Sequence, residues 1–318
     1  MMSIYGDDRV ADAAARLREA MGRSVLSFPL TSFTEDGEID IAGFRDHVGR
    51  QVAAGPAALF VCCGTGEFFS LAEPEYEQLL TAAVAEVGGR VPVVAGLGYG
   101  WAQASRFAAA AERAGVDAGL LMPHYLVDAP QLGLVAQVRE VAARTALPLI
   151  VYQRGQVRFS AAAIAELGGV HGVIGLKDGH SDLDQLQRAR LAAPPDWLFF
   201  NGAATAEMQA RAYRTVGVPA YSSAVHSFAP EIASAFFRAF VAHDDDTVEK
   251  LLRGFYWPLV ELRDRRAGYA VSLVKAAARL RGERVGRVRA PLTDPTPDET
   301  TELEALLDTG LGLVGAHR

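Results

Sequence analysis

The feature that most constrains the fold is an alternation of short apolar runs with longer amphipathic stretches. The apolar runs are continuous, with no polar residue at every second position, as expected for parallel strands covered on both faces. Eight such runs occur, and they occupy residues 24–30, 57–63, 91–97, 116–122, 147–152, 172–177, 197–202 and 218–224.

The stretches between these runs have the spacing and composition of helices. The clearest are 73–87, 101–115, 131–145 and 205–216, and several helical stretches begin at Ser, Thr, Asp or Pro and end at glycine. Strands that alternate with helices form right-handed βαβ units around a parallel sheet. Eight of them predict an α/β protein of the (β/α)8 TIM-barrel type. An open doubly wound sheet is the alternative, but it usually carries a glycine fingerprint after the first strand, and "SFPLTSF" has no glycine.

The two ends of the chain add helices to this barrel. A helix is expected at about 7–21, before the first strand, and only helical patterns follow residue 230. "DDD" at 244–246 supplies an N-cap and favourable charge for one of these helices. We therefore expect a catalytic barrel with its N-terminal helix over 1–242 and a C-terminal helical extension over 243–318.

Composition excludes several classes of protein. The net charge of −7 over 318 residues argues against a nucleic-acid or acidic-membrane partner. No apolar run approaches the roughly 20 residues of a membrane span, and the N-terminus lacks the pattern of a secretory signal. Cys62 and Cys63 are adjacent, which predicts two buried free thiols in a reducing cytoplasm. The seven histidines show no HxH or HxxxH pairing, so no metal site is expected.

Lysine is rare in this chain: of 31 basic side chains, only Lys177, Lys250 and Lys275 are lysines. Lys177 ends the sixth apolar run, at the position where a barrel strand meets the active site. Desolvation there would lower the pKa of its amine and allow attack on a ketone to form a Schiff base. The alternative is an ordinary lysine whose amine lies in water. Lys250 is interpreted as a solvated helix residue, and Lys275 as an anchoring ion pair or interface residue.

Other polar side chains follow the remaining strands and would converge on the same pocket. Tyr152 ends the strand next to that of Lys177 and could transfer protons during imine formation and enolisation. In "GTGE", the backbone amides and the Thr65 hydroxyl could hold a carboxylate. Tyr125, Ser222 and Ser223 also lie at strand ends. Each residue is a weak signal alone, and their placement at successive strand ends carries the hypothesis.

These strand ends resemble those of the dihydrodipicolinate synthase/N-acetylneuraminate lyase family of Schiff-base barrels. The resemblance extends from about residue 24 to residue 290. It rests on "LSFPLTSF", "GTGEFFSL", "LLMPHYLVDAPQLGL", "VYQRG", "GLKDG", "NGAATAE", "YSSAVHSFAPEIA" and "AVSLVKA". It implies that Lys177 is the Schiff-base lysine and that Tyr152 is the proton shuttle. It also implies that Gly64, Thr65 and Gly66 bind the keto-acid carboxylate, and that Tyr125 enters the pocket of a neighbouring subunit.

The chain departs from the synthase branch of that family in two places. Gly64 stands where that branch has a second hydroxyl residue, and Val157 stands where it has an arginine, a role that Arg154 or Arg158 would take over. The motifs "GTGEFFSL", "YLVDAPQ" and "YSSAV" instead resemble a dehydratase branch, although Gln153 stands where that branch is expected to have asparagine.

The dehydratase resemblance implies a small-molecule substrate, a six-carbon keto sugar diacid that loses water and carbon dioxide. No cofactor would be needed beyond the covalent Schiff base on Lys177, and family members assemble as homotetramers built from two dimers. The distal carboxylate of the diacid would bind Ser222, Ser223, Asn201 or Arg154.

Two alternatives remain open from the sequence. One is a related class I aldolase, or a pentonate dehydratase, of the same family. The other is a non-catalytic keto-acid sensor that kept the barrel and lost turnover. Release of carbon dioxide from the diacid would separate the dehydratase from both.

Overall fold

A computed structural model describes residues 4–318, with side chains from residue 10 onward. Eight parallel strands form one sheet in the order β7-β6-β5-β4-β3-β2-β1-β8, and a parallel bridge between Asn201 and Tyr221 joins its two ends. The strands are β1 (Leu26–Ser27), β2 (Ala58–Val61), β3 (Val93–Leu97), β4 (Ala118–Leu121), β5 (Leu149–Gln153), β6 (Val173–Asp178), β7 (Leu198–Asn201) and β8 (Ser222–Ser223). Each overlaps its predicted apolar run, so the closed barrel is confirmed and the open sheet is excluded.

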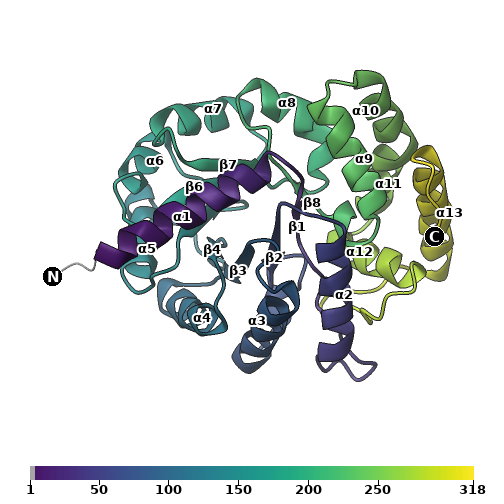
Figure 1. The fold of residues 1–318 in the computed structure, drawn as a ribbon, viewed down its shortest axis with the longest axis horizontal. Coiled ribbons are helices and arrows are strands. Elements are labelled where there is room, and N and C mark those ends of the chain that lie inside the picture. Colours follow the sequence, from purple (N-terminus) through teal and green to yellow (C-terminus); the bar gives the residue numbers. More distant parts are fainter. Residues whose placement is uncertain (1–3) are drawn as a thin grey trace.

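Helices surround the barrel (Figure 1). They are α2 (Ile41–Ala53), α3 (Glu73–Val87), α4 (Trp101–Ala114), α5 (Gln131–Ala142), α6 (Ala161–Leu167), α7 (Leu183–Ala192), α8 (Ala210–Thr215) and α9 (Pro230–Val241). Three of the four clearest predicted helices are confirmed as α3, α4 and α5. The stretch 205–216 divides into a 3-10 turn, Ala206–Gln209, followed by α8.

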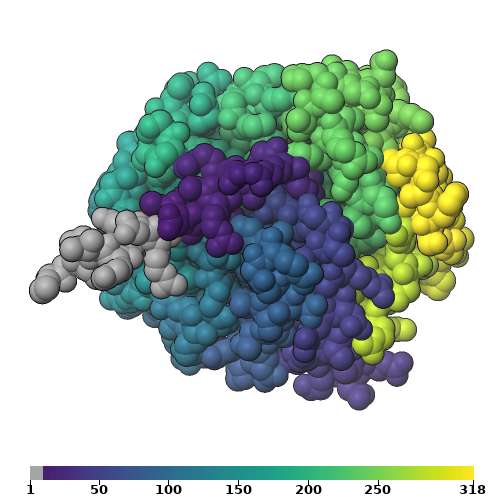
Figure 2. Space-filling model, viewed as in Figure 1, coloured from purple at the N-terminus to yellow at the C-terminus, as the bar shows by residue number. Residues whose placement is uncertain are grey.

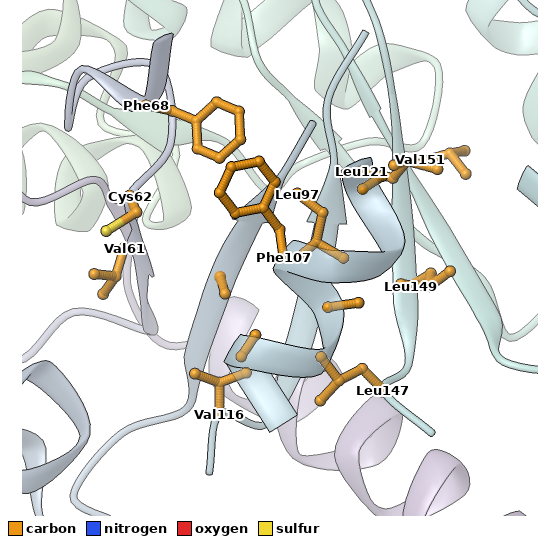
Figure 3. Packing of buried hydrophobic residues seen from close by; sticks show 14 of the residues in the cluster. Val61, Cys62, Phe68, Leu97, Phe107, Val116, Leu121, Leu147, Leu149 and Val151 are labelled. Carbon is orange, nitrogen blue, oxygen red and sulfur yellow. The ribbon is translucent and has the colours of Figure 1, made fainter. Parts of the chain in front are cut away.

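The main apolar core lies between the strands and this helical ring. In Figure 3 the rings of Phe68 and Phe107 lie next to each other and close to Leu97; their centroids are 4.9 Å apart and their planes are inclined by 60°. Leu121 and Val151 continue the layer on the next two strands. This packing fixes the barrel and therefore the directions in which its strand ends point.

The N-terminal helix α1 (Ile4–Met21) lies across one mouth of the barrel (Figures 1 and 2). Its Leu17 and Met21 belong to an apolar cluster with Ala57 and Ala220, which precede β2 and β8. The covered mouth is therefore the end at which the strands begin. The strands end at the opposite mouth, where barrel enzymes place their active sites.

The C-terminal segment is helical, as predicted. It comprises α10 (Asp245–Leu251), a π-helical turn (Leu252–Tyr256), α11 (Trp257–Arg263), α12 (Tyr269–Leu280) and α13 (Pro297–Leu313). The predicted N-cap is present: the Asp244 side chain accepts a hydrogen bond of 3.1 Å from the Thr247 amide. These helices share one apolar cluster with Leu30 and Tyr221 of the barrel. The proposed boundary between residues 242 and 243 therefore separates two parts that pack on one core.

None of the helices in the described part of the chain is long and apolar enough to cross a membrane.

Candidate active site

Lys177 lies near the end of β6 and is buried, with 6% of its surface exposed. Its Nζ is 4.0 Å from the ring centroid of Phe28, 4.5 Å from that of Tyr152 and 5.8 Å from that of Phe200. Within residues 10–318, no hydrogen bond or ion pair of this amine is recorded. Burial of this amine, with no carboxylate partner in that part of the chain, disfavours its protonated form.

Burial lowers the pKa of Lys177 from its usual 10.5 to about 7. Cys63 and Arg154 act on it electrostatically, in opposite directions. Burial also raises the pKa of the Cys63 thiol to about 12, so this thiol is neutral at pH 7 and offers the lysine no counter-charge. A large fraction of the Lys177 amine is therefore an uncharged nucleophile near neutral pH.

Gly202 leaves room for the Lys177 side chain. A Cβ at position 202 would lie 2.3 Å from Cε of Lys177 and 2.6 Å from its Cγ, well inside contact distance. Any larger residue would push the lysine from its position. Glycine at this turn is thus explained by the side chain that packs on it.

Tyr152 lies on β5, directly beside Lys177 in the register of the sheet. Its hydroxyl donates to the carbonyl oxygen of Gly202 at 3.3 Å and accepts from Nη1 of Arg154 at 3.3 Å. Burial raises the pKa of the phenol, and Arg154 partly opposes that rise. A protonated phenol next to an unprotonated amine is a suitable arrangement for moving protons at an imine.

The loop after β2 presents unpaired donors to the same cavity. The amides of Glu67 and Phe68 donate to the carbonyls of Gly64 and Cys63, whereas the amide of Thr65 donates no hydrogen bond recorded among the described residues. The Thr65 hydroxyl likewise has no recorded partner. Thr65 can therefore offer both groups to a carboxylate.

A buried ion pair joins this loop to helix α12. Nζ of Lys275, on α12, lies 2.7 Å from Oε1 of Glu67, and both side chains have no exposed surface. Oε2 of Glu67 accepts from the amide of Arg289 at 2.9 Å, and the Glu67 backbone is left-handed with φ of 56°. The prediction of an anchoring ion pair for Lys275 is confirmed. The C-terminal helices thus hold the carboxylate-binding loop in place.

Lys177, Tyr152 and Thr65 line one cavity of about 480 Å³ at the mouth where the strands end. Gly64, Arg154 and Ser222 line it too. The structure therefore brings together residues of four strand ends that the sequence placed in one pocket.

Other predicted site residues lie outside the cavity lining. Asn201 is buried, donating to the carbonyl of Ala206 at 3.2 Å and accepting from the amide of Ala203 at 2.9 Å. Ser223 is buried and donates to Glu207 at 2.5 Å. Gly66 accepts from the Thr31 hydroxyl at 2.6 Å through its carbonyl, and so shapes the loop. Tyr125 is 71% exposed and does not reach the cavity of its own chain.

Gln153 and Asp178 follow the two key residues but have a structural role. Nε2 of Gln153 donates to Oδ1 of Asp178 at 2.7 Å, and Asp178 also accepts a hydrogen bond from the Tyr213 hydroxyl. Both side chains are buried, on the opposite face of their strands from Tyr152 and Lys177. The glutamine in place of the expected asparagine therefore lies outside the cavity.

Two residues of the cavity wall were missed from the sequence. Arg263, at the end of α11, lines the cavity, and its Nη1 donates to the Thr205 hydroxyl at 2.7 Å. "PLVELRDRR" gives no signal for this role, since arginine at a helix end is common on protein surfaces. Thr205 lies in the quoted "NGAATAE", but nothing in that string distinguishes it from its neighbours.

Among the described residues, no group of three or more His, Cys, Asp or Glu side chains is placed to hold a metal ion.

Comparison with known proteins agrees with this geometry. The sequence profile described as the dihydrodipicolinate synthetase family matches residues 21–309. The chain belongs to this family. A relative from Streptomyces coelicolor, named probable 5-dehydro-4-deoxyglucarate dehydratase 2, is 68% identical over 96% of this chain and 95% of its own length. A protein of the same name from Streptomyces avermitilis is 65% identical over 96% of this chain and 92% of its own.

Solved structures of the family share the fold. The dihydrodipicolinate synthase from Bacillus clausii superposes with a TM-score of 0.84, at 25% identity, over 92% of this chain and 98% of the synthase. The barrel fold is thus shared with this synthase, as the resemblance implied, and the coverage of 92% of this chain includes C-terminal helices that the sequence pattern predicted.

Proposed function

We propose that this protein is a 5-dehydro-4-deoxyglucarate dehydratase, which converts 5-dehydro-4-deoxy-D-glucarate to 2,5-dioxopentanoate, water and carbon dioxide. The observation that carries the proposal is the buried Lys177 amine, which has no carboxylate partner within residues 10–318 and is enclosed with Tyr152 in one cavity. Relatives of 68% and 65% identity that bear this enzyme's name support the choice of substrate.

Catalysis would begin with attack of the Lys177 amine on the C5 ketone. Loss of water from the carbinolamine gives an iminium ion, with Tyr152 supplying and accepting protons at the reacting oxygen. The C6 carboxylate, next to the ketone, would rest on the Thr65 hydroxyl and the loop amides.

Elimination and decarboxylation would follow on the same iminium. A proton leaves C4 to Tyr152 or to water, and the resulting enamine expels the C3 hydroxyl as water. The conjugated iminium then accepts the electron pair of the C1–C2 bond, so carbon dioxide leaves and a dienamine forms. Protonation at C4, enol-to-aldehyde conversion with protonation at C3, and hydrolysis release the product and the free amine. Lys177 serves as the electron sink, so no external cofactor enters the proposal.

The decisive experiment is incubation with the diacid while carbon dioxide and aldehyde are followed. Equimolar release of both supports the proposal. Formation of pyruvate would instead identify the aldolase alternative, and water loss without carbon dioxide would identify a simple dehydratase. Borohydride trapping at Lys177 without turnover would identify the sensor.

We further propose a homotetramer, a dimer of dimers, in the cytoplasm. The loop after β4 exposes Tyr125 at 71%, Leu126 at 77% and Val127 at 62%, and α5 adds Leu132 at 77%. An apolar patch of this kind is typical of a protein interface, and it surrounds the tyrosine expected to enter a neighbouring pocket. Sedimentation of the Leu126→Asp variant tests this: loss of the tetramer supports the proposal, and an unchanged tetramer contradicts the use of this patch.

A further inference from the structure

The charges that face the catalytic cavity are all positive among the lining residues that the structure describes. They belong to Arg154 and Arg263 and to the protonated fraction of Lys177, and no Asp or Glu joins them. A cavity of this kind favours an anionic ligand with more than one charge. Arg154 contacts the Tyr152 hydroxyl and so lies beside the reacting carbons, which leaves Arg263 for a more distant group.

Arg263 enters the cavity from the C-terminal helices, and 17% of its side chain is exposed. Its Nη1 donates to the Thr205 hydroxyl at 2.7 Å, and its Nε donates to Asp264 at 2.8 Å. The Asp264 side chain is 61% exposed, so this pair is solvated and weak. A guanidinium has five N–H donors, and no partner of Nη2 is recorded in the described chain. The group is therefore oriented but retains donors for a second carboxylate.

Thr205, which accepts the hydrogen bond from Arg263, has a strained backbone conformation. Its φ is 52°, in the left-handed region that a β-branched residue rarely adopts, and its side chain is buried against the cavity. Backbone strain of this kind persists only where surrounding structure imposes it, and it is frequent at ligand sites. The strained backbone of Thr205 and the hydrogen bond that orients Arg263 both point to a ligand site in this part of the cavity.

The short chain between Gly202 and Thr205 sets an upper limit on the distance from the lysine to this corner. Gly202 packs against the Lys177 side chain, and Ala203, Ala204 and Thr205 continue along the wall to Arg263. Three residues span at most about 10 Å. In an extended substrate, four carbon–carbon bonds separate C5 from the C1 carboxylate carbon by roughly 5 Å, and a hydrogen bond adds about 3 Å.

Three other candidates for the distal group are engaged in hydrogen bonds within the protein. Asn201 and Ser223 are buried in hydrogen bonds away from the cavity. Ser222 donates to the carbonyl of Asn201 at 3.2 Å. The wall around Arg263 is apolar, with Leu259, Leu273 and Val274, so its guanidinium lies in surroundings that strengthen a charged hydrogen bond.

We propose that Arg263, positioned by Thr205, binds the distal carboxylate of a keto diacid whose ketone is joined to Lys177. This inference rests on the proposed Schiff-base function and names the residue that selects diacids over monoacids.

The test compares two probes that differ only at the far end, 2-oxohexanedioate and 2-oxohexanoate. Each is titrated against the enzyme, reduced with borohydride, and the Lys177 adduct is counted by mass spectrometry. We expect the wild type to prefer the diacid, and Arg263→Met to lose roughly 10- to 100-fold in half-saturation for the diacid alone. Arg253→Met, an exposed arginine on the same helical run, is the matched control and should keep the preference.

If Arg263→Met also loses trapping of the monoacid, the variant has failed to fold. Two milder variants then test the proposal. Arg263→Lys keeps the charge without the planar fork and should retain part of the diacid preference. Thr205→Val removes the positioning hydroxyl and should weaken the diacid roughly 3- to 10-fold, with the monoacid unchanged.

The outcomes separate this inference from the proposed function. If the wild type traps neither probe, the Schiff-base function itself is wrong. If it traps both equally well, or if Arg263→Lys and Thr205→Val change the trapping of both probes to the same extent, the function stands and the assignment of Arg263 is overturned.

Discussion

Lys177 and Lys275 are two buried lysines in nearly matched surroundings. Each amine lies 4.0 Å from the centroid of a phenylalanine ring, Phe28 for Lys177 and Phe33 for Lys275. Lys275 has the side chain of Glu67 at 2.7 Å, whereas Lys177 has no carboxylate partner recorded among the described residues. Burial lowers the pKa of both amines, to about 7 for Lys177 and to about 8 for Lys275, where Glu67 opposes the fall.

The main difference between the two lysines is the carboxylate contact and not the degree of burial. A buried lysine with a carboxylate remains an ammonium ion and serves as an anchor. A buried lysine without one loses its proton near neutral pH and can attack a carbonyl. The two residues also cooperate, since the anchor at Lys275 holds the loop that would bind the carboxylate of the ketone attacked by Lys177.

The largest expected effect comes from removing the nucleophile. Lys177→Met should lower turnover by more than about 10⁴-fold, because no other lysine lines the cavity among the described residues. Its free energy of unfolding should stay the same or rise, because burying a lysine amine without a partner opposes folding. Turnover with the diacid and urea unfolding measure the two quantities. Parental turnover in this variant would contradict the Schiff-base proposal.

The same substitution at Lys275 should lower the free energy of unfolding instead of leaving it unchanged or raising it. Lys275→Met leaves the Glu67 carboxylate buried without a counter-charge, which should reduce the free energy of unfolding by about 3–5 kcal/mol. Adding Glu67→Gln removes that charge and should restore most of the lost stability, because the side-chain oxygen of the glutamine can still accept the hydrogen bond of the Arg289 backbone amide. A double variant no more stable than Lys275→Met would show that the pair is not what stabilises this region.

The phenol is the second feature that distinguishes the two lysines. Tyr152→Phe should keep the ring beside Lys177 but lower turnover roughly 10²- to 10³-fold, because the hydroxyl that transfers protons is lost. Borohydride trapping of the imine should persist, although it should form more slowly. Tyr99→Phe is a suitable control, since Tyr99 is partly buried but lies outside the cavity lining. Turnover equal to the wild type would assign the proton transfer to another group.

The sequence predicted the barrel, all eight strands and the pairing of Lys177 with Tyr152, because continuous apolar runs and strand ends follow directly from residue order. It also predicted Thr65 as a loop donor. It could not predict that Asn201 and Ser223 turn away from the cavity, because that depends on partners such as Ala206 and Glu207 across a loop. Arg263 was missed for a related reason: it reaches the cavity only through packing of the C-terminal helices, which no local pattern encodes.

The smallest expected effect comes from giving Lys177 the partner that Lys275 already has. Cys63 lines the cavity and acts electrostatically on Lys177, so Cys63→Asp would place a carboxylate near the amine. In the wild type, kcat/KM should rise with pH up to about 7, because the amine reacts only after losing its proton. An added carboxylate favours the ammonium form and should raise that pKa by roughly one to three units.

The activity of Cys63→Asp at pH 7 should therefore fall about 5-fold for a shift of one unit and about 50-fold for a shift of two, and recover at alkaline pH. Cys63→Ser, which adds no charge, should keep the wild-type profile. The pH dependence of kcat/KM for both variants measures the difference. A profile that Cys63→Asp leaves unmoved would mean that the charge state of Lys177 does not limit catalysis, and that the missing carboxylate is not what separates the nucleophile from the anchor.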